Sequence, residues 1–183
     1  LIESAYISTA AGFLALLPVM MDEGNPPDVT ELFRRLVARH PMLAEGHDAL
    51  GTAALRSENF PLAMSSAQRA VELAPYWTPA KMLLARSQVA SGQEDVGLAT
   101  AREVVTGPDS DVATHVEYAL LLAGTGREDE ARAMLTPYAS GQVVVPAAVR
   151  ALGLMDLQGG DLKAAEARFE DLLSTGSQSY ESL

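Results

Sequence analysis

Small apolar residues recur along this chain at a spacing of 34 positions, as the glycines Gly92, Gly126 and Gly160 show. Each of these glycines stands at a predicted turn between two amphipathic segments. Small residues follow each turn at the same spacing, at Ala63, Gly97, Ala131 and Ala165. A third set precedes the turns, at Gly51, Ala85, Ala119 and Gly153. The pattern predicts stacked pairs of antiparallel helices, with small residues where the helices approach too closely for larger side chains.

The cleanest predicted unit covers residues 44–77. Its second helix is expected to begin at the cap Asn59, with Pro61 in the first turn, where proline is favoured. Apolar residues then return every three or four positions, the period of one helical face, at Ala63, Ala67, Ala70 and Leu73. Pro75 is expected to close the unit.

Three further units follow in the same register, over residues 78–111, 112–145 and 146–179. In the second of these, Pro137 is expected to end the helix early, because proline lacks an amide proton and clashes with the preceding turn. Residues 138–145 are then expected to form a loop that packs over the helix pair. Asp161 is the expected cap of the last second helix.

A degenerate unit over residues 1–43 precedes the clean ones. Its first helix is expected within residues 2–17, before Pro18, and Asp28 begins a variant capping box. The apolar N-terminal run is too short to span a bilayer and is expected to pack as a helix. Residues 180–183 resemble the start of another repeat, which indicates a piece of a longer array.

In this register the chain resembles the tetratricopeptide repeat (TPR) family over residues 28–179, although His47 stands at the usual tryptophan position. The resemblance implies an all-α fold, a right-handed α-solenoid of antiparallel helix hairpins. It also implies a scaffold whose concave face, lined by the first helices, holds a peptide or a partner protein.

The usual groove-facing positions of the family give a set of candidate binding residues. They are Asp48, Leu55, Arg56, Met82, Arg86, Val89, Val116, Leu120, Arg150, Leu154 and Leu157. This face is charged near its start and apolar toward its end, and an exposed apolar strip usually marks a contact site. The N-terminal helix or a later repeat covering the strip is an equally weighted alternative. Tyr76 and Trp77 are candidate hot spots, with packing between repeats as the alternative.

One well-specified activity of the family is excluded by charge. Chaperone-binding TPR domains clamp a C-terminal carboxylate with Lys, Asn and Arg side chains. The matching positions here are acidic, apolar or small, namely Asp48, Thr52, Leu83, Ala113 and Glu117. Such a set does not supply the charge-assisted hydrogen bonds that a carboxylate clamp needs.

Composition narrows the remaining classes of function. The net charge of −11 argues against nucleic acid as the main partner, and the absence of cysteine excludes thiol chemistry. His47 and His115 occupy equivalent positions and are expected to pack in place of an aromatic residue. Asp109, Ser110 and Asp111 near His115 are expected to form a turn and a helix cap. No metal, cofactor or enzymatic activity is predicted.

The sequence therefore predicts a non-enzymatic scaffold that binds a protein or peptide on its concave helical face. The alternative is a structural module whose N-terminal helix and open C-terminal end mediate self-association. The Ala-rich, Arg-over-Lys composition resembles that of long bacterial envelope TPR proteins, which suggests an adaptor for an envelope protease or assembly complex. The cytoplasm is the alternative compartment.

Overall fold

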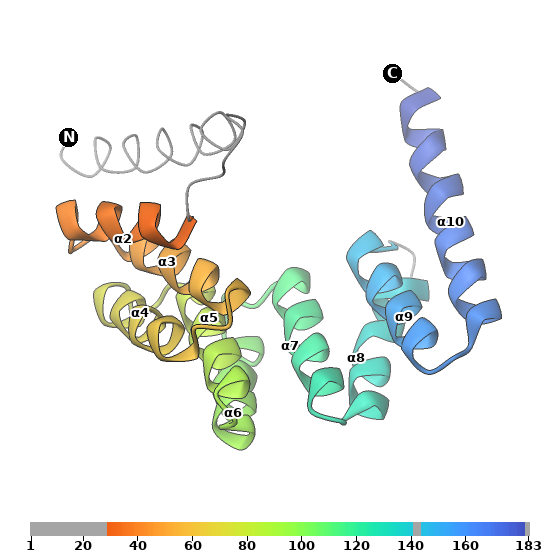
Figure 1. The fold of residues 1–183 in the computed structure, drawn as a ribbon. Helices are drawn as coiled ribbons and strands as arrows, with labels where there is room; N and C mark the ends of the chain where they lie inside the picture. The colour runs from red at the N-terminus through yellow and green to blue at the C-terminus, as the bar shows by residue number, and fades with distance from the viewer. Residues whose placement is uncertain (1–28, 141–143, 182–183) are drawn as a thin grey trace. The chain divides into compact units, whose positions relative to one another are not determined.

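The computed structural model describes residues 29–140 and 144–181, with side chains as far as residue 173 (Figure 1). The helix expected within residues 2–17 and the capping box at Asp28 lie outside the described residues. Within the described part of the chain, no helix is long and apolar enough to cross a membrane.

Every regular element of the described residues is an α-helix, which confirms the predicted all-α helical repeat. The helices are α2 (Val29–Arg39), α3 (Ala44–Arg56), α4 (Phe60–Leu73), α5 (Thr78–Ala90), α6 (Glu94–Val105), α7 (Val112–Gly124), α8 (Glu128–Ser140), α9 (Pro146–Gln158) and α10 (Leu162–Glu181). The first helices of the four helix pairs are α3, α5, α7 and α9, and the second helices are α4, α6, α8 and α10.

The chain divides into two compact units, Leu1–Gln93 and Glu94–Leu183. In unit 1, α3 packs against α2, α4 and α5, and α4 also packs against α5. In unit 2, α7 packs against α6, α8 and α9, and α9 also packs against α8 and α10. Within each unit, therefore, one first helix contacts the next directly, so neighbouring first helices contribute to a common surface.

The turns between first and second helices repeat one hydrogen-bond pattern. The amide of Gly92 donates to the carbonyl of Val89 at 2.9 Å, and the amide of Gln93 donates to Gln88 at 2.9 Å. These two bonds define the Schellman motif that ends many helices. The same pair of bonds recurs after α3, α7 and α9. Gly92, Gly126 and Gly160 all have φ near +80° there, a conformation that glycine adopts without a steric penalty.

Glu58 occupies the equivalent turn position after α3 and adopts φ of 57°. A residue with a Cβ atom is strained in this left-handed region by about 1 kcal/mol or more. The geometry of the turn is therefore imposed by the packing of α3 against α4, and a glycine is favoured there but not required.

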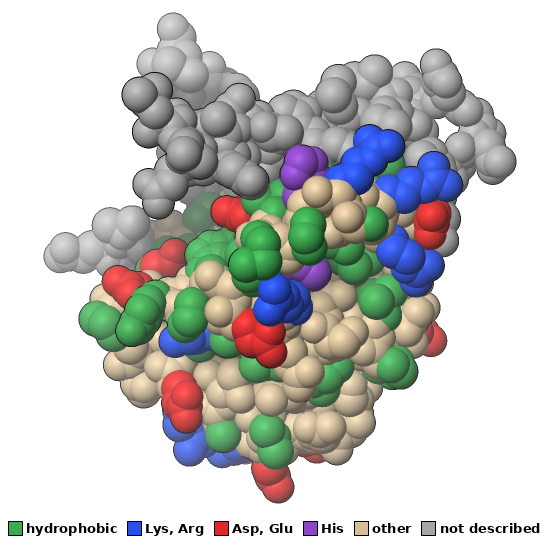
Figure 2. All heavy atoms as spheres, turned by 90° about the vertical axis from the view of Figure 1, so that its left-hand side faces the viewer, with side chains coloured by type: hydrophobic (Ala, Val, Ile, Leu, Met, Phe, Trp, Pro, Cys, Tyr) green, Lys and Arg blue, Asp and Glu red, His purple; other side chains and the backbone are tan. Residues whose placement is uncertain are grey.

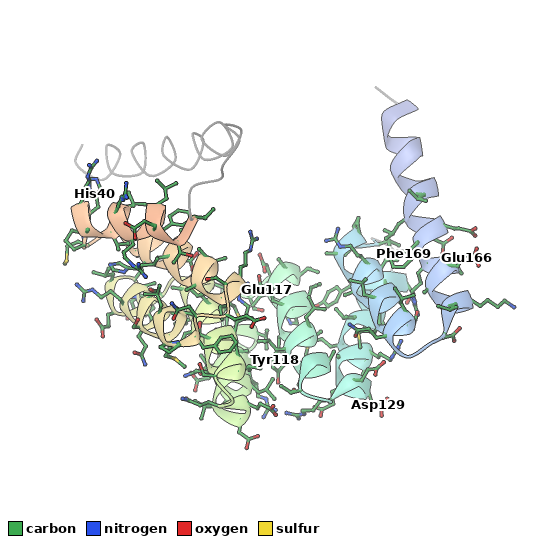
Figure 3. All side chains as sticks on the ribbon, in the orientation of Figure 1. His40, Glu117, Tyr118, Asp129, Glu166 and Phe169 are labelled. Carbon is green, nitrogen blue, oxygen red and sulfur yellow. The ribbon has the colours of Figure 1, made fainter. Side chains whose placement is uncertain are left out.

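The small residues of the first helices lie where neighbouring helices approach most closely. A Cβ atom added to Gly51 would lie 2.8 Å from the Cδ2 atom of Leu83 on α5. A Cβ atom added to Gly153 would lie 2.8 Å from the Cζ atom of Phe169, which projects from α10 toward α9 (Figure 3). Ala85 and Ala119, at the equivalent positions of α5 and α7, are fully buried. The predicted close approach is thus present in the structure.

Each unit has its own apolar core. One cluster in the core of unit 1 is formed by α2, the α2–α3 connection and α3, through Phe33, Leu36, Leu43, Leu50 and Ala53. Helices α4 and α5 add further buried residues, among them Met82 and Leu83. The largest fully buried side chains of unit 2 are Leu122, Leu135 and Leu152. These come from α7, α8 and α9 respectively, so the core of unit 2 joins a helix pair to the following first helix.

Three predicted helix caps are confirmed. The side-chain Oδ1 atom of Asn59 accepts a hydrogen bond from the amide of Leu62 at 3.3 Å. Asp111 accepts from the amide of Thr114 at 2.8 Å. Asp161 accepts from the amide of Ala164 at 3.0 Å. These contacts satisfy amide groups that have no partner within their own helices.

The prediction that Pro137 ends its helix was wrong, and so was the loop expected to begin at residue 138. Helix α8 continues through Pro137 to Ser140. Pro137 is exposed and lies in the last turn, where only a few residues follow the missing amide bond. On either side of it, Thr136 donates its hydroxyl to the carbonyl of Arg132 at 2.7 Å and Ser140 donates its hydroxyl to the carbonyl of Thr136 at 2.8 Å.

The close approach at Gly153 predicts that two glycine-to-alanine variants change the free energy of unfolding in opposite directions. We expect Gly153→Ala to lower the free energy of unfolding by about 1–3 kcal/mol, because the new methyl group overlaps the Phe169 ring. The matched control is Gly124→Ala in α7, where an added Cβ atom meets nothing within 4 Å. We expect this variant to gain up to about 1 kcal/mol from helix propensity. Urea unfolding followed by circular dichroism measures both, and equal effects would contradict the steric argument.

Candidate functional site

The predicted binding residues fall into three groups by exposure. Met82 and Val116 are buried, so their side chains belong to the packed interior. The half-buried group comprises Asp48, Leu55, Arg86 and Val89. The exposed group comprises Arg56, Leu120, Arg150, Leu154 and Leu157. The parts of the predicted site that a partner can contact most fully are therefore arginines and leucines.

Unit 2 exposes three leucines on its first helices, which are called here the leucine face. Leu120 on α7 and Leu154 on α9 occupy equivalent positions of consecutive repeats, and each is 45% exposed. Leu157 follows Leu154 by one helical turn and is 48% exposed. Because α7 and α9 pack against each other, these leucines contribute to one surface. Arg150 is also exposed, one turn before Leu154.

Unit 1 carries a polar and a charged residue at the corresponding positions. Arg86 on α5 is equivalent to Leu120 and Leu154, and Thr52 is the equivalent residue on α3. Arg56 follows Thr52 by one turn, so it lies on the same side of α3. The two arginines therefore lie on adjacent, contacting helices of unit 1. The sequence prediction of a binding face that is charged near its start stays a prediction.

The two predicted hot-spot residues differ in exposure. Tyr76 is 88% exposed in the turn between α4 and α5, so its ring is available for contact. Trp77 is half-buried and directly precedes α5, and its amide donates to the carbonyl of Ala74 at 3.1 Å. Tyr76 thus fits a contact role better than Trp77, which also packs within unit 1.

Exposed arginines also lie along α2, at Arg34, Arg35 and Arg39. Figure 2 shows Lys and Arg side chains near one edge of the face it displays, close to a histidine, with hydrophobic side chains scattered elsewhere. Arg34 and Arg35 both pair with Glu31 on the same helix, at 3.3 and 3.0 Å. Exposed pairs of this kind contribute little to stability. The arginines of α2 are therefore interpreted as part of a solvated helix surface and not as a binding site.

The polar groups around His115 do not form a catalytic arrangement. The carboxylate of Asp111 accepts hydrogen bonds from the amide and hydroxyl groups of Thr114, at 2.8 and 2.6 Å. These bonds hold the pKa of Asp111 below its usual value. The Nδ1 atom of His115 lies 2.8 Å from the backbone carbonyl of Asp111 and 3.3 Å from the Ser110 hydroxyl.

The His115 ring also packs against Tyr138, with ring centroids 5.7 Å apart. The carboxylate of Asp111 is therefore committed to capping α7 and not to orienting an imidazole. Within the described residues, no group of His, Asp and Glu side chains is arranged to hold a metal ion. The absence of enzymatic activity stays a prediction.

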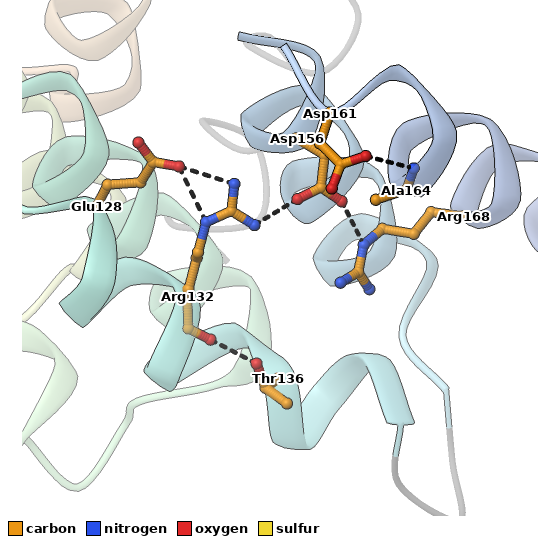
Figure 4. Close-up of polar contacts among 7 residues, drawn as sticks. All are labelled: Glu128, Arg132, Thr136, Asp156, Asp161, Ala164 and Arg168. Carbon is orange, nitrogen blue, oxygen red and sulfur yellow. Dashed lines mark hydrogen bonds and ion pairs between the residues drawn. The ribbon is translucent and has the colours of Figure 1, made fainter. Parts of the chain in front are cut away.

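Sequence analysis missed a buried ion-pair network in unit 2 (Figure 4). Asp156 on α9 is buried, and its carboxylate pairs with Arg132 on α8 and with Arg168 on α10, the latter at 2.7 Å. Arg132 also pairs with the exposed Glu128 at 2.7 Å. A signal was present in the sequence, because Asp156 stands one repeat after the buried Leu122, at a position expected to be apolar.

Burial and pairing act in opposite directions on Asp156. Burial raises the pKa of its carboxyl group, but the hydrogen bonds from Arg132 and Arg168 outweigh burial and hold that pKa below its usual value. The carboxyl group is thus ionised at neutral pH and ties three helices together. Its role in the fold is structural, because both of its oxygens are engaged by arginines of neighbouring helices.

Comparisons with known proteins agree with this architecture. No known family model matches the chain, and no curated protein matches its sequence. TTC0263, a thermophilic TPR protein of Thermus thermophilus, superposes with a TM-score of 0.71 at 19% identity, over 98% of this chain and 94% of its own. The chain has the TPR fold.

Two further TPR proteins show the same likeness. A protein of Parabacteroides merdae ATCC 43184 gives a TM-score of 0.68 at 14% identity, over 95% of this chain and 73% of its own. YrrB, described as a TPR protein with an unusual peptide-binding site, gives 0.53 at 14% identity, over 92% of this chain and 84% of its own. TPR arrays present extended surfaces on their stacked helices, which is the arrangement that the leucine face follows.

The Asp156 network predicts that one variant of this TPR chain loses stability in a pH-dependent way. We expect Asp156→Asn to lower the free energy of unfolding by about 2 kcal/mol at neutral pH, because two charge-assisted hydrogen bonds are weakened. A depressed carboxyl pKa stabilises the folded state above the unfolded value of about 4, and this contribution is lost as the pH falls through the folded value. The difference between wild type and variant should therefore shrink below about pH 4.

Urea unfolding at a series of pH values measures this difference. Glu128→Gln is the matched control, because it removes an exposed carboxylate that also pairs with Arg132, and it should cost less than about 1 kcal/mol. A difference between wild type and Asp156→Asn that persists unchanged into the acid range would contradict the assignment.

Proposed function

We propose that this chain is a non-enzymatic scaffold that binds a partner protein or peptide on the surface of its first helices. The observation that carries the proposal is the leucine face of unit 2. Leu120 and Leu154 repeat the same exposed apolar position on two packed helices, and Leu157 extends it by one turn. Exposed leucines at equivalent positions favour a contact surface over chance exposure of single side chains.

Two further facts support the proposal. YrrB, which has a similar fold, is described as having a peptide-binding site. The described residues around His115 and Asp156 are engaged in capping and packing, which favours a structural use of the polar groups in unit 2. The envelope-adaptor role expected from composition is the finer form of this proposal, and cell fractionation tests it.

The leucine face predicts the loss of a partner in a double variant. Capture from a native extract should retain a partner on the wild-type chain and lose it, by about tenfold or more, on Leu120→Asp/Leu154→Asp. The reason is that burying one leucine contributes about 1.5–3 kcal/mol to binding, which a charged side chain reverses. Quantitative mass spectrometry of the eluates is the measurement.

The matched control is Val96→Asp/Leu162→Asp, which adds the same charge at exposed apolar positions of unit 2 outside the leucine face. Circular dichroism should show native helix content in both variants. Equal retention of the partner by wild type and by the Leu120→Asp/Leu154→Asp variant would overturn the proposal.

A second candidate function is self-association through α10. Leu173 on α10 is 75% exposed, and burial of this helix against another copy would remove that apolar surface from water. If so, sedimentation velocity should show a mass that rises with protein concentration, and Leu173→Asp should abolish the rise. A monomer mass at every concentration would remove this candidate and leave the scaffold proposal intact.

A further inference from the structure

The arginines of this chain differ in their pairing. Three of the four arginines of the second helices pair with carboxylates, as Arg69 does with Glu72 at 2.9 Å and Arg168 does with Asp156 at 2.7 Å. The fourth, Arg102, donates to the Tyr118 hydroxyl at 3.3 Å. Among the described residues, the three arginines of the first helices, Arg56, Arg86 and Arg150, form no ion pair within 4 Å. This is unexpected in a chain with 24 acidic and 13 basic residues, where carboxylates are in excess.

The absence of a polar partner is clearest at Arg86. The residue is half-buried, and its Nε atom is buried without a hydrogen-bond partner. A buried donor without an acceptor raises the free energy of the folded state, and groups of this kind need an explanation. A ligand oxygen that engages the Arg86 guanidinium, after a small rotation of the side chain, supplies the missing acceptor.

Arg56 lies on α3, the helix that packs directly against the helix of Arg86. It is exposed, one helical turn from Thr52, and Thr52 is the α3 residue in register with Arg86 on α5. The two helices pack directly against each other. Two guanidinium groups on adjacent helices match two carboxylates of one extended segment, since each guanidinium can bind a carboxylate with two hydrogen bonds.

We propose that the first-helix face of unit 1 binds an acidic segment of the partner, with Arg86 and Arg56 each engaging a Glu or Asp side chain. This rests on the proposed scaffold function and names the chemistry of its ligand. The positions differ from those of the terminal-carboxylate clamp, which hold Asp48 and Thr52 on α3. The segment is therefore recognised by its side chains and not by a free chain end.

The excess negative charge of the chain opposes the binding of an acidic segment. A net charge of −11 repels acidic peptides at long range, so any affinity must come from local contact with these arginines. Binding of an acidic probe at physiological ionic strength is thus a specific result for this protein.

The test uses the whole chain, ¹⁵N-labelled, and three short peptides. Acetylated and amidated tetraglutamate is the ligand probe, and its tetraglutamine counterpart removes the charge. Acetylated tetraglutamine with a free C-terminus offers only a terminal carboxylate. We expect the Nε–H signals of Arg86 and Arg56 to shift with tetraglutamate to saturation and to stay unchanged with both tetraglutamine peptides.

Variants then distinguish the loss of a specific arginine contact from a mere change in net charge. Arg86→Gln should weaken tetraglutamate binding about tenfold or more, since a charge-assisted contact is lost, and Arg86→Lys should weaken it less. Lys81→Gln is the matched control, because it removes the same charge from α5 at a point about 140° around the helix from Arg86. It should change the affinity less than about twofold.

Three results would overturn the inference: no shift with tetraglutamate, a shift only with the free C-terminus, or equal weakening by Lys81→Gln and Arg86→Gln. The Val96→Asp/Leu162→Asp variant, which adds two negative charges at exposed positions outside both proposed contact surfaces, should bind tetraglutamate like the wild type. If tetraglutamate does not bind while the Leu120→Asp/Leu154→Asp variant still loses its partner, the scaffold function is supported and only this inference is wrong.

Discussion

The close approach of neighbouring helices at small side chains is the constraint on which the rest of the structure depends. Gly51 and Gly153 have no room for a methyl group, and Ala85 and Ala119 are fully buried at the same position of their helices. Because a first helix must contact its neighbour at this point, its orientation about its own axis is fixed. That orientation decides which side chains are buried and which remain exposed, including the leucine face and the unit 1 arginines.

The turn geometry is a consequence of that packing more than its cause. Glu58 takes the left-handed conformation that glycine takes in the other turns, and it accepts the strain without changing the hydrogen-bond pattern. A local preference is therefore overridden where the contacts between α3 and α4 require it. Pro137 is a different case, because α8 continues through it only in its last turn, where few residues follow the missing amide bond.

The repeat register made most of the fold predictable from the sequence. Helix pairs, their caps at Asn59, Asp111 and Asp161, and the close-packed positions all follow from local chemistry that recurs at one spacing. Contacts between side chains distant in sequence were not predictable in this way. The burial of Met82 and Val116 depends on neighbouring helices, and the Arg132–Asp156–Arg168 network joins three of them.

Asp156 and Arg86 are both charged residues at positions where other repeats carry leucine, but their surroundings differ. Asp156 replaces a core leucine, and the free-energy cost of burying its charge is offset by two arginines from adjacent helices. Arg86 replaces a surface leucine of the later repeats, yet no carboxylate of the described chain compensates its partial burial. Within the described residues, then, the buried charge of Asp156 is paired on both sides, whereas the Nε atom of Arg86 has no partner, and this difference is what the proposed acidic ligand would remove.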